Sequence, residues 1–347
     1  MTLEQNIESF SELGNILRNI LDGKETSYGK RFHAIIENHY KTNPWFTPDN
    51  IRMAIKSIAY KLTYDNLKRW TDRYPAISIE YKPLRVGVIM AGNIPLVGFH
   101  DFLTVLISGN NLLAKTSSKD SELISAIADI LFSIHEEFRN RIEFANGQLK
   151  DFDLVIATGS DNSSRYFEYY FGRYPHIIRK NRNSVAIIEG DESDTDFRNL
   201  GTDIFSYFGL GCRNVSKIYL PAGFDLHRMI KNWNEFSGIV NHNRYANNYE
   251  YNMAVYMVNR EKFVDTGFLL LRENRTLSSP VAVLHYQYYA SLKDVSFDIE
   301  SQPEKIQCIV SKKEIPFGIA QYPELWDFAD NIDTLDFLLK KKMSGIM

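Results

Sequence analysis

The chain has 347 residues. At about 150 residues per domain, this length predicts two domains, or one large domain with an insertion. Hydrophobic residues make up 44% and charged residues 24% of the sequence, which is typical of a soluble globular protein. The formal net charge of −3 lacks the basic footprint of a protein that binds nucleic acid electrostatically. Two cysteines are too few for a disulfide framework or a four-thiolate zinc site, and they favour a reducing compartment.

The amino-terminus lacks the features of a secretory signal. Met1 to Glu4 shows neither a basic nor an apolar region. No apolar run approaches the roughly 18 residues that span a bilayer. We therefore expect a soluble, cytoplasmic protein with no membrane span and no nucleic-acid partner.

The first eighty residues have the periodicity of helices. Apolar residues recur at helical spacing over residues 16–21, and the pattern ends near Gly23. Thr47 followed by Pro48 is typical of an N-cap with proline at the first helical position. The sequence predicts that the next helix covers residues 51–70.

From Leu84 onwards, short apolar runs alternate with helical segments. Strands are expected at residues 85–90, 112–115 and 154–157, and helices at residues 97–107 and 122–138. This order is typical of a parallel sheet with crossover helices, and such sheets bind ligands outside the carboxyl ends of their strands. Asn93, Lys115 and the pair Gly159 and Ser160 follow these ends, so we expect them at one ligand-binding edge.

The rest of the chain is also expected to alternate. A strand is expected at residues 185–188, a helix at 196–208 and a strand at 216–220. Further on, the sequence predicts strands at residues 253–258, 281–284, 308–310 and 318–320, and a helical tail at 325–339.

Cys212 lies in a glycine-flanked break between a predicted helix and a predicted strand. Glycines allow close approach of a ligand, and Arg213 would favour the thiolate, so Cys212 is a candidate nucleophile. The alternative is a small apolar residue buried in a tight turn. Cys308, inside an apolar run, is interpreted as core. The eight histidines form no ligand-spaced cluster with the cysteines, and we expect no metal.

Each residue at the predicted sheet edge has two interpretations. Asn93 could cap a helix or donate to a developing oxyanion. Lys115 could be solvated or bind a ribose or a phosphate. Gly159 and Ser160 could form an N-cap turn or hold phosphate at a helix N-terminus. Together they predict a nucleotide site near a thiol.

These residues resemble the aldehyde dehydrogenase superfamily. More closely, they resemble the acyl-CoA reductases that include the fatty-acyl reductase component of bacterial bioluminescence. The resemblance runs from Leu84 to Leu339 and rests on four motifs in the family's order. They are the Asn-x-Pro turn of the oxyanion hole at residues 93–95, the strand whose Lys contacts the adenosine ribose at 113–116, the Gly-Ser loop near the pyrophosphate at 158–160, and the nucleophile segment at 208–212.

Three departures from the superfamily pattern are informative. Residues 179–183 replace the segment whose Glu activates water, so the resemblance implies reduction without hydrolysis of the acyl-enzyme. The basic run from Arg179 to Arg182 could also meet phosphates of either CoA or the cofactor. Ser118, followed by Lys119, replaces a Glu that binds the ribose 2′-hydroxyl, which suits a 2′-phosphate and favours NADPH. Glu314 to Gly318 resembles the Glu-x-Phe-Gly segment that contacts the nicotinamide ribose, with one extra residue.

The resemblance implies an α/β, aldehyde dehydrogenase-like fold with a Rossmann-like parallel sheet and a second α/β catalytic domain. The implied activity is NADPH-dependent reduction of a long-chain fatty acyl-CoA to an aldehyde, through a thioester on Cys212. Asn93 would help bind the oxyanion, and His242 could carry protons or serve only a structural role. The implied cofactor-binding residues are Lys115, Ser118, Gly159 and Ser160.

The expected organisation is a cofactor domain at residues 1–188, a catalytic domain at 189–325 and a helical tail at 326–347. By analogy with the superfamily we expect a homo-oligomer, and an acyl-supplying protein is a candidate partner. Two alternatives stay open. One is a reductase of another activated acyl group, either an acyl phosphate or a protein-bound acyl group. The other is an inactive relative that binds acyl groups or a partner.

Overall fold

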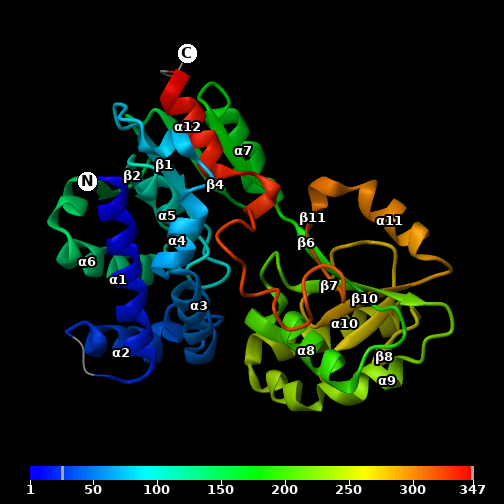
Figure 1. Cartoon of the computed structure of the whole chain (residues 1–347). Helices are drawn as coiled ribbons and strands as arrows, with labels where there is room; N and C mark the ends of the chain where they lie inside the picture. Colours follow the sequence, from blue (N-terminus) through cyan, green and yellow to red (C-terminus); the bar gives the residue numbers. More distant parts are fainter. Residues whose placement is uncertain (25–26, 345–347) are drawn as a thin grey trace. The chain divides into compact units, whose positions relative to one another are not determined.

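The computed structural model describes residues 1–24 and 27–344 (Figure 1). The chain forms two compact units, Met1–Asn181 with Pro323–Met347, and Arg182–Tyr322. The sequence predicts a boundary at Ile188 and a separate tail. The division falls earlier because strand β6 (Asn183–Ile187) pairs with strands of the second unit. No helix in the described part of the chain is long and apolar enough to cross a membrane.

The first unit surrounds a five-stranded parallel sheet with helices. The sheet order is β3 (Ile142–Phe144), β2 (Asn111–Lys115), β1 (Arg85–Ile89), β4 (Leu154–Thr158) and β5 (His176–Arg179). The helices are α1 (Leu3–Leu21), α2 (Gly29–Asn38), α3 (Pro48–Lys61), α4 (Tyr64–Thr71), α5 (Phe99–Ile107), α6 (Ser121–Ile134), α7 (Asp161–Phe171) and α12 (Thr334–Ser344). The predicted strands β1, β2 and β4 are confirmed, whereas β3 and β5 were not expected.

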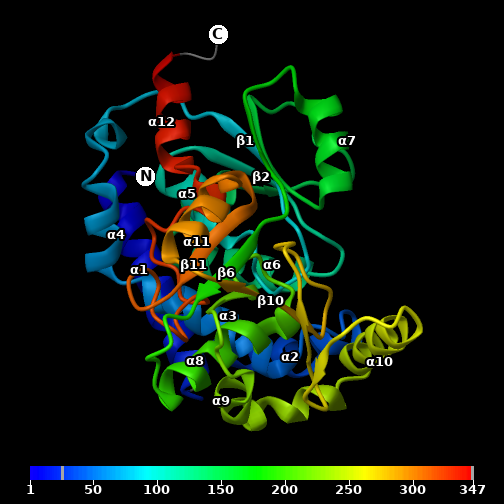
Figure 2. The same ribbon diagram turned by 90° about the vertical axis from the view of Figure 1, so that its right-hand side faces the viewer.

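The amino-terminal helices form as their capping residues predict, with one break. The Thr47 side chain accepts a hydrogen bond from Asn50 N, and Pro48 opens α3, which confirms the predicted cap. The predicted helix 51–70 is two helices, because the backbone leaves the helical region at Leu62 and Thr63 caps α4. Helices α1 and α4 pack side by side (Figures 1 and 2).

Within the first unit, the buried Arg179 connects the carboxyl-terminal tail to β5 and α5. Arg179, at the end of β5, is 3% exposed and donates through Nη2 to Asp101 Oδ1 on α5 at 2.7 Å. The same guanidinium donates to Ala329 O and Thr334 Oγ1, each at 2.7 Å. The tail helix α12 packs on α5 and begins only at Thr334, because Asp330 and its neighbour have left-handed backbone angles. The predicted start at residue 325 is therefore wrong.

The second unit contains a six-stranded sheet. Its order is β11 (Ile306–Val310), β6, β7 (Val215–Pro221), β10 (Val283–Tyr289), β9 (Leu270–Glu273) and β8 (Val264–Asp265), with only the β8–β9 pair antiparallel among the described residues. Its helices are α8 (Asp194–Phe205), α9 (Leu226–Ile230), α10 (Asn243–Val258) and α11 (Leu292–Glu300).

Two strand predictions in this unit are wrong. Residues 253–258 are the end of helix α10, and residues 318–320 form no strand. The apolar run in α10 belongs to a helical pattern, since Tyr249, Met253 and Tyr256 recur at helical spacing and pack in one cluster with Leu270. A six-residue window could not distinguish this pattern from a strand.

Three basic side chains stand side by side across the second sheet. Lys217 on β7 is in register with His285 on β10, which is in register with Arg272 on β9. His285 is buried, and its Nδ1 lies 3.1 Å from Thr276 Oγ1. Burial lowers the pKa of His285, and the positive charges of Arg272 and Lys217 lower it further.

This row makes the stability of the second unit sensitive to acid. Because the pKa of His285 is lower in the folded than in the unfolded state, the unfolded state binds more protons between the two values. The free energy of unfolding should therefore fall as the pH drops below about 6.5. His285→Asn should flatten that dependence, as measured by urea unfolding at about pH 7.5 and about pH 5.5. An equally steep dependence in the variant would contradict this assignment.

Candidate active site

The carboxyl edge of the first sheet brings three of the predicted loops together. Ile89 is in register with Lys115 on one side and with Ala157 on the other. The turn after β1, the loop after β2 and the loop after β4 therefore leave the sheet at the same level. Asn93 and Ser160 lie on the first and third of these loops, at the edge where parallel sheets bind ligands.

The turn that carries Asn93 is packed directly on the loop after Lys115. A Cβ atom added to Gly92 would lie 2.5 Å from Ser117 Oγ and 2.7 Å from Ser117 Cβ, so a side chain there would force the two loops apart. Asn93 and Ser118 are exposed, and Lys115 is half-buried. Polar side chains of both loops are thus exposed at this edge.

Gly159 and Ser160 form the N-cap turn that is one of their two interpretations. The Ser160 side chain caps α7 by accepting a hydrogen bond from Ser163 N at 3.3 Å. A Cβ atom on Gly159 would lie 2.8 Å from both Ser163 Cβ and Phe167 Cε2, so glycine permits close packing of this helix. A phosphate-binding role for this loop stays a prediction.

A histidine from the helical layer supports the loop after β2, and the sequence does not indicate it. His39 is buried and stacks on Phe46 with ring centroids 5.2 Å apart. Its Nε2 lies 3.0 Å from Lys119 O, and its Nδ1 lies 3.1 Å from Glu122 Oε2. The amino-terminal helices therefore help to fix the carboxyl edge of the first sheet. Their distance along the chain from residues 115–120 explains why spacing alone could not predict this.

In the second unit, Cys212 lies in a braced loop between α8 and β7. It is half-buried, and its carbonyl oxygen accepts a hydrogen bond from Ser184 Oγ at 2.8 Å. Asn214 is buried and ties the loop to the end of α8. Its Oδ1 accepts from Gly211 N at 2.8 Å, and its Nδ2 donates to Asp203 O at 3.0 Å and to Ser206 O at 2.8 Å. This side chain fixes the backbone on both sides of Cys212.

The backbone before Cys212 is strained. The predicted helix ends at Phe205 instead of Phe208, because Tyr207 (φ 51°) and Phe208 (φ 58°) adopt left-handed conformations. Such conformations cost about 1–3 kcal/mol per non-glycine residue and cluster at functional sites. The Asn214 hydrogen bonds to the end of α8 help to maintain this geometry.

The segment that resembles Glu-x-Phe-Gly packs on the same helix. The Asp203 carboxylate on α8 accepts from Gly318 N at 2.6 Å and from Ala320 N at 3.0 Å. Burial raises the pKa of Asp203 to about 7, although these two hydrogen bonds oppose the shift. Arg213 Nη1 donates to Ala320 O at 3.5 Å, so this segment also contacts the residue next to Cys212. Glu314 itself is exposed.

His242 serves a structural role in this unit. Its Nδ1 accepts from Tyr245 N at 3.4 Å and caps α10. Its ring lies against Phe208, with centroids 4.3 Å apart. A role in proton transfer stays a prediction.

The basic residues between Arg179 and Arg182 form ion pairs and hydrogen bonds within the protein. Arg179 is buried in the ion pair with Asp101, so the expectation that it could meet a phosphate is wrong. Lys180 pairs with Glu168 at 3.3 Å. Arg182 donates to the backbone oxygen of Ile306 at 3.1 Å. This segment contributes to the stability of both units.

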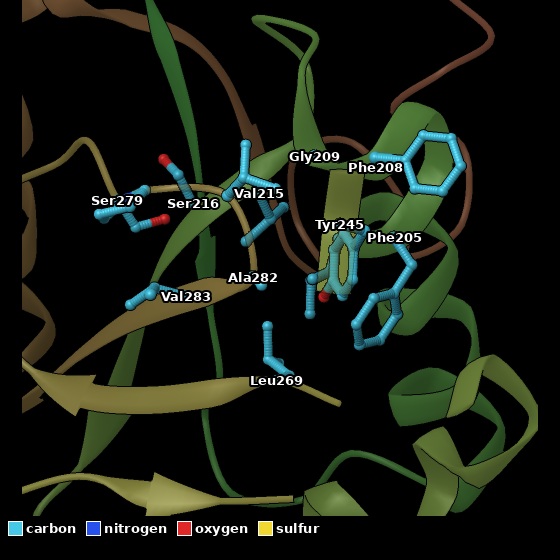
Figure 3. A pocket seen from close by; sticks show the side chains of 13 residues that line it. Phe205, Phe208, Gly209, Val215, Ser216, Tyr245, Leu269, Ser279, Ala282 and Val283 are labelled. Atoms are coloured by element: carbon cyan, nitrogen blue, oxygen red, sulfur yellow. The ribbon is translucent and has the colours of Figure 1, made fainter. Parts of the chain in front are cut away.

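A pocket adjoins the segment that carries Cys212. Its empty volume is about 340 Å³, part of which is open to solvent. Phe208 and Gly209 line it from before Cys212, and Val215 and Ser216 from after it. Figure 3 shows aromatic side chains on one side of the pocket, with Ser279 and Val283 on the other. The lining mixes aromatic and aliphatic side chains with the hydroxyl groups of Ser216, Ser279 and Tyr245.

Comparison with known families decides the relationship. The family model described as acyl-CoA reductase (LuxC) matches residues 24–229, more than half of the chain. The chain belongs to the LuxC family of acyl-CoA reductases. The match includes Asn93, Lys115 and Cys212. It supports an oxidoreductase that acts on acyl groups and forms aldehydes. No curated protein matches the chain.

Solved structures of aldehyde dehydrogenases share the fold of this LuxC-family chain. Aldehyde dehydrogenase 21 from Physcomitrella patens, in complex with succinate, is 12% identical over 99% of this chain and 85% of that chain, with a TM-score of 0.65. The Mycobacterium tuberculosis aldehyde dehydrogenase complexed with NAD+ is 12% identical over 92% and 75%, with a TM-score of 0.62. At this identity the likeness shows the fold, and it confirms the predicted aldehyde dehydrogenase-like α/β architecture.

Proposed function

We propose that this LuxC-family chain is an NADPH-dependent reductase that converts a fatty acyl-CoA to a fatty aldehyde through a thioester on Cys212. The observation that carries the proposal is the loop around Cys212, which is strained, flanked by glycine and held by Ser184 and Asn214. A thiol on a fixed loop is suited to covalent catalysis on an acyl group.

In the proposed reaction, the Cys212 thiolate attacks the carbonyl carbon of the acyl-CoA thioester. The bond between that carbon and the sulfur of CoA breaks, CoA leaves as the thiolate, and the acyl group stays on Cys212. From the family resemblance, the Asn93 amide is the proposed side-chain donor to the oxyanion, a role that contributes about 3–4 kcal/mol for one such donor. When bound, NADPH would supply a hydride to the acyl carbon. The carbonyl of the acyl group on Cys212 would become an alkoxide, and its collapse would break the bond to the Cys212 sulfur, which releases the aldehyde and restores the thiolate.

The residues at the carboxyl edge of the first sheet fit a phosphorylated nicotinamide cofactor. Lys115 and the exposed Lys119 supply positive charge, and the exposed Ser118 supplies a hydroxyl where the superfamily often has a carboxylate. A carboxylate at this position would repel a 2′-phosphate, whereas a cation attracts it. The close packing of Gly92 on Ser117 lets the backbone of two loops approach the same ligand.

Reversing the charge of Lys119 tests the choice of cofactor. Lys119→Glu should raise the KM for NADPH by about tenfold, because a charge-assisted contact worth about 1.4 kcal/mol is lost. The KM for NADH should change little. Lys150→Glu is the matched control, since residue 150 precedes the amino end of β4 at the opposite edge of the sheet. An equal increase for both cofactors would contradict a 2′-phosphate contact.

Substrate comparison tests the proposed function itself. NADPH consumption should be measured with acyl-CoA of increasing chain length, with an acyl phosphate and with an acyl group carried on a protein. We expect the highest kcat/KM with a long-chain acyl-CoA. A clear preference for either other acyl donor would favour the alternative reductase. No turnover with any donor and no NADPH binding by calorimetry would favour the inactive, partner-binding alternative.

A further inference from the structure

Asp120 is a buried acid at the carboxyl edge of the first sheet. Its carboxyl group makes no hydrogen bond to the helix that follows it. It occupies the N-cap position of α6, yet its side chain makes no capping hydrogen bond. Instead, Oδ2 accepts a hydrogen bond from Leu96 N at 2.7 Å. The residue is 5% exposed, and Oδ1 has no hydrogen-bond partner within the described chain. The carboxyl group is thus directed at the turn after β1.

Leu96 lies in the same turn as Asn93, before α5 begins at Phe99. Its backbone is left-handed (φ 57°), and its side chain is buried, so the conformation must be held by its surroundings. Asp120 accepts from the backbone N–H of this residue. At the other end of the turn, Gly92 packs on Ser117. The loop after β2 therefore fixes the Asn93 turn at both ends.

Burying a carboxyl group costs free energy, whereas an uncharged capping side chain at this position would not carry that cost. Burial raises the pKa of Asp120 to about 8, and the hydrogen bond from Leu96 N only partly opposes this shift. A serine or asparagine would satisfy the helix end without burying an acid. Residues that depart from the local preferences of their position, as this buried acid does at a helix N-cap, are concentrated at functional sites.

We propose that Asp120 is a positioning residue for acyl reduction, which acts through Leu96 to fix the turn that carries Asn93, the proposed oxyanion donor. This inference rests on the proposed function. The neutral acid retains a carbonyl oxygen that accepts from Leu96 N, so the role does not require a charged carboxylate. Asp120 touches neither the substrate nor the cofactor in this account.

A double-variant cycle on the full chain tests the inference. The readout is the single-turnover rate of CoA release from dodecanoyl-CoA. Asp120→Ala should slow this rate by about tenfold to a hundredfold, as expected for a misplaced oxyanion donor, and should leave the Kd for NADPH within about twofold. In the Asn93→Ala background, Asp120→Ala should cost less than about twofold, because both changes remove the same interaction. Asp120→Asn, which keeps the acceptor oxygen, should restore most of the rate.

Matched controls separate positioning from general damage. Asp129→Ala removes a half-buried acid, paired with Arg31, from the same helix and should leave the rate unchanged. Asp120→Val fills the same space without an acceptor, and it replaces the alanine variant if that protein melts below the assay temperature. Equal losses from Asp120→Ala in both backgrounds would overturn the inference alone. Absence of CoA release from the wild type would overturn the proposed function, and this inference with it.

Discussion

Replacing Cys212 with alanine should abolish acyl-CoA-dependent NADPH oxidation, by at least about 10³-fold, because the proposed nucleophile is lost. The Kd for NADPH should stay close to that of the wild type, since the residues proposed to bind the cofactor lie in the first unit. Steady-state assays of NADPH consumption and calorimetric titration of NADPH measure the two effects separately.

The second cysteine provides the control for this prediction. Cys308 is buried in β11, and its Sγ lies 3.0 Å from Ser184 Oγ, which supports its interpretation as a core residue. Cys308→Ala should keep the acyl-CoA-dependent activity and lower the melting temperature. If Cys212→Ala retains turnover while Cys308→Ala loses it, the nucleophile has been assigned to the wrong thiol.

Replacing Arg179 with alanine should destabilise the first unit by about 3–5 kcal/mol. The change leaves the buried Asp101 carboxylate without its partner and removes the hydrogen bonds to Ala329 O and Thr334 Oγ1. Urea unfolding monitored by tryptophan fluorescence measures the loss. The carboxyl-terminal segment should also become more sensitive to proteolysis, because these bonds hold it to the sheet.

The exposed ion pair of Lys180 provides the control for the loss of stability in Arg179→Ala. Lys180 pairs with Glu168 near the surface, and such pairs contribute about 0–1 kcal/mol. Lys180→Ala should therefore change the free energy of unfolding only slightly. Equal effects from Arg179→Ala and Lys180→Ala would show that the buried pair does not hold the tail.

The features that the sequence predicts well have a strong local pattern. Strands β1, β2 and β4 are short apolar runs with polar residues directly after them, so the positions of Asn93, Lys115 and Ser160 at one edge follow from parallel pairing alone. Strand β5 escapes prediction because Arg179 is buried as an ion pair, which no local pattern indicates.

The residues that brace the site could not be predicted for a different reason. Asn214 and Asp120 act through hydrogen bonds to backbone groups, which depend on how the loops fold. His39 reaches Lys119 across 80 residues of sequence. Sequence spacing identifies the residues proposed to meet substrate and cofactor, whereas the structure identifies those that hold them in place. The homo-oligomer and an acyl-supplying partner stay predictions.

The central claim is that an acyl group is carried on Cys212 before it is reduced. Peptide mass spectrometry after incubation with an acyl-CoA, without NADPH, tests this claim most directly. The account predicts one acyl adduct, located on the peptide that contains Cys212, which disappears on addition of NADPH as the aldehyde forms. Aldehyde formation without an adduct on Cys212, or with the adduct on another residue, would contradict it.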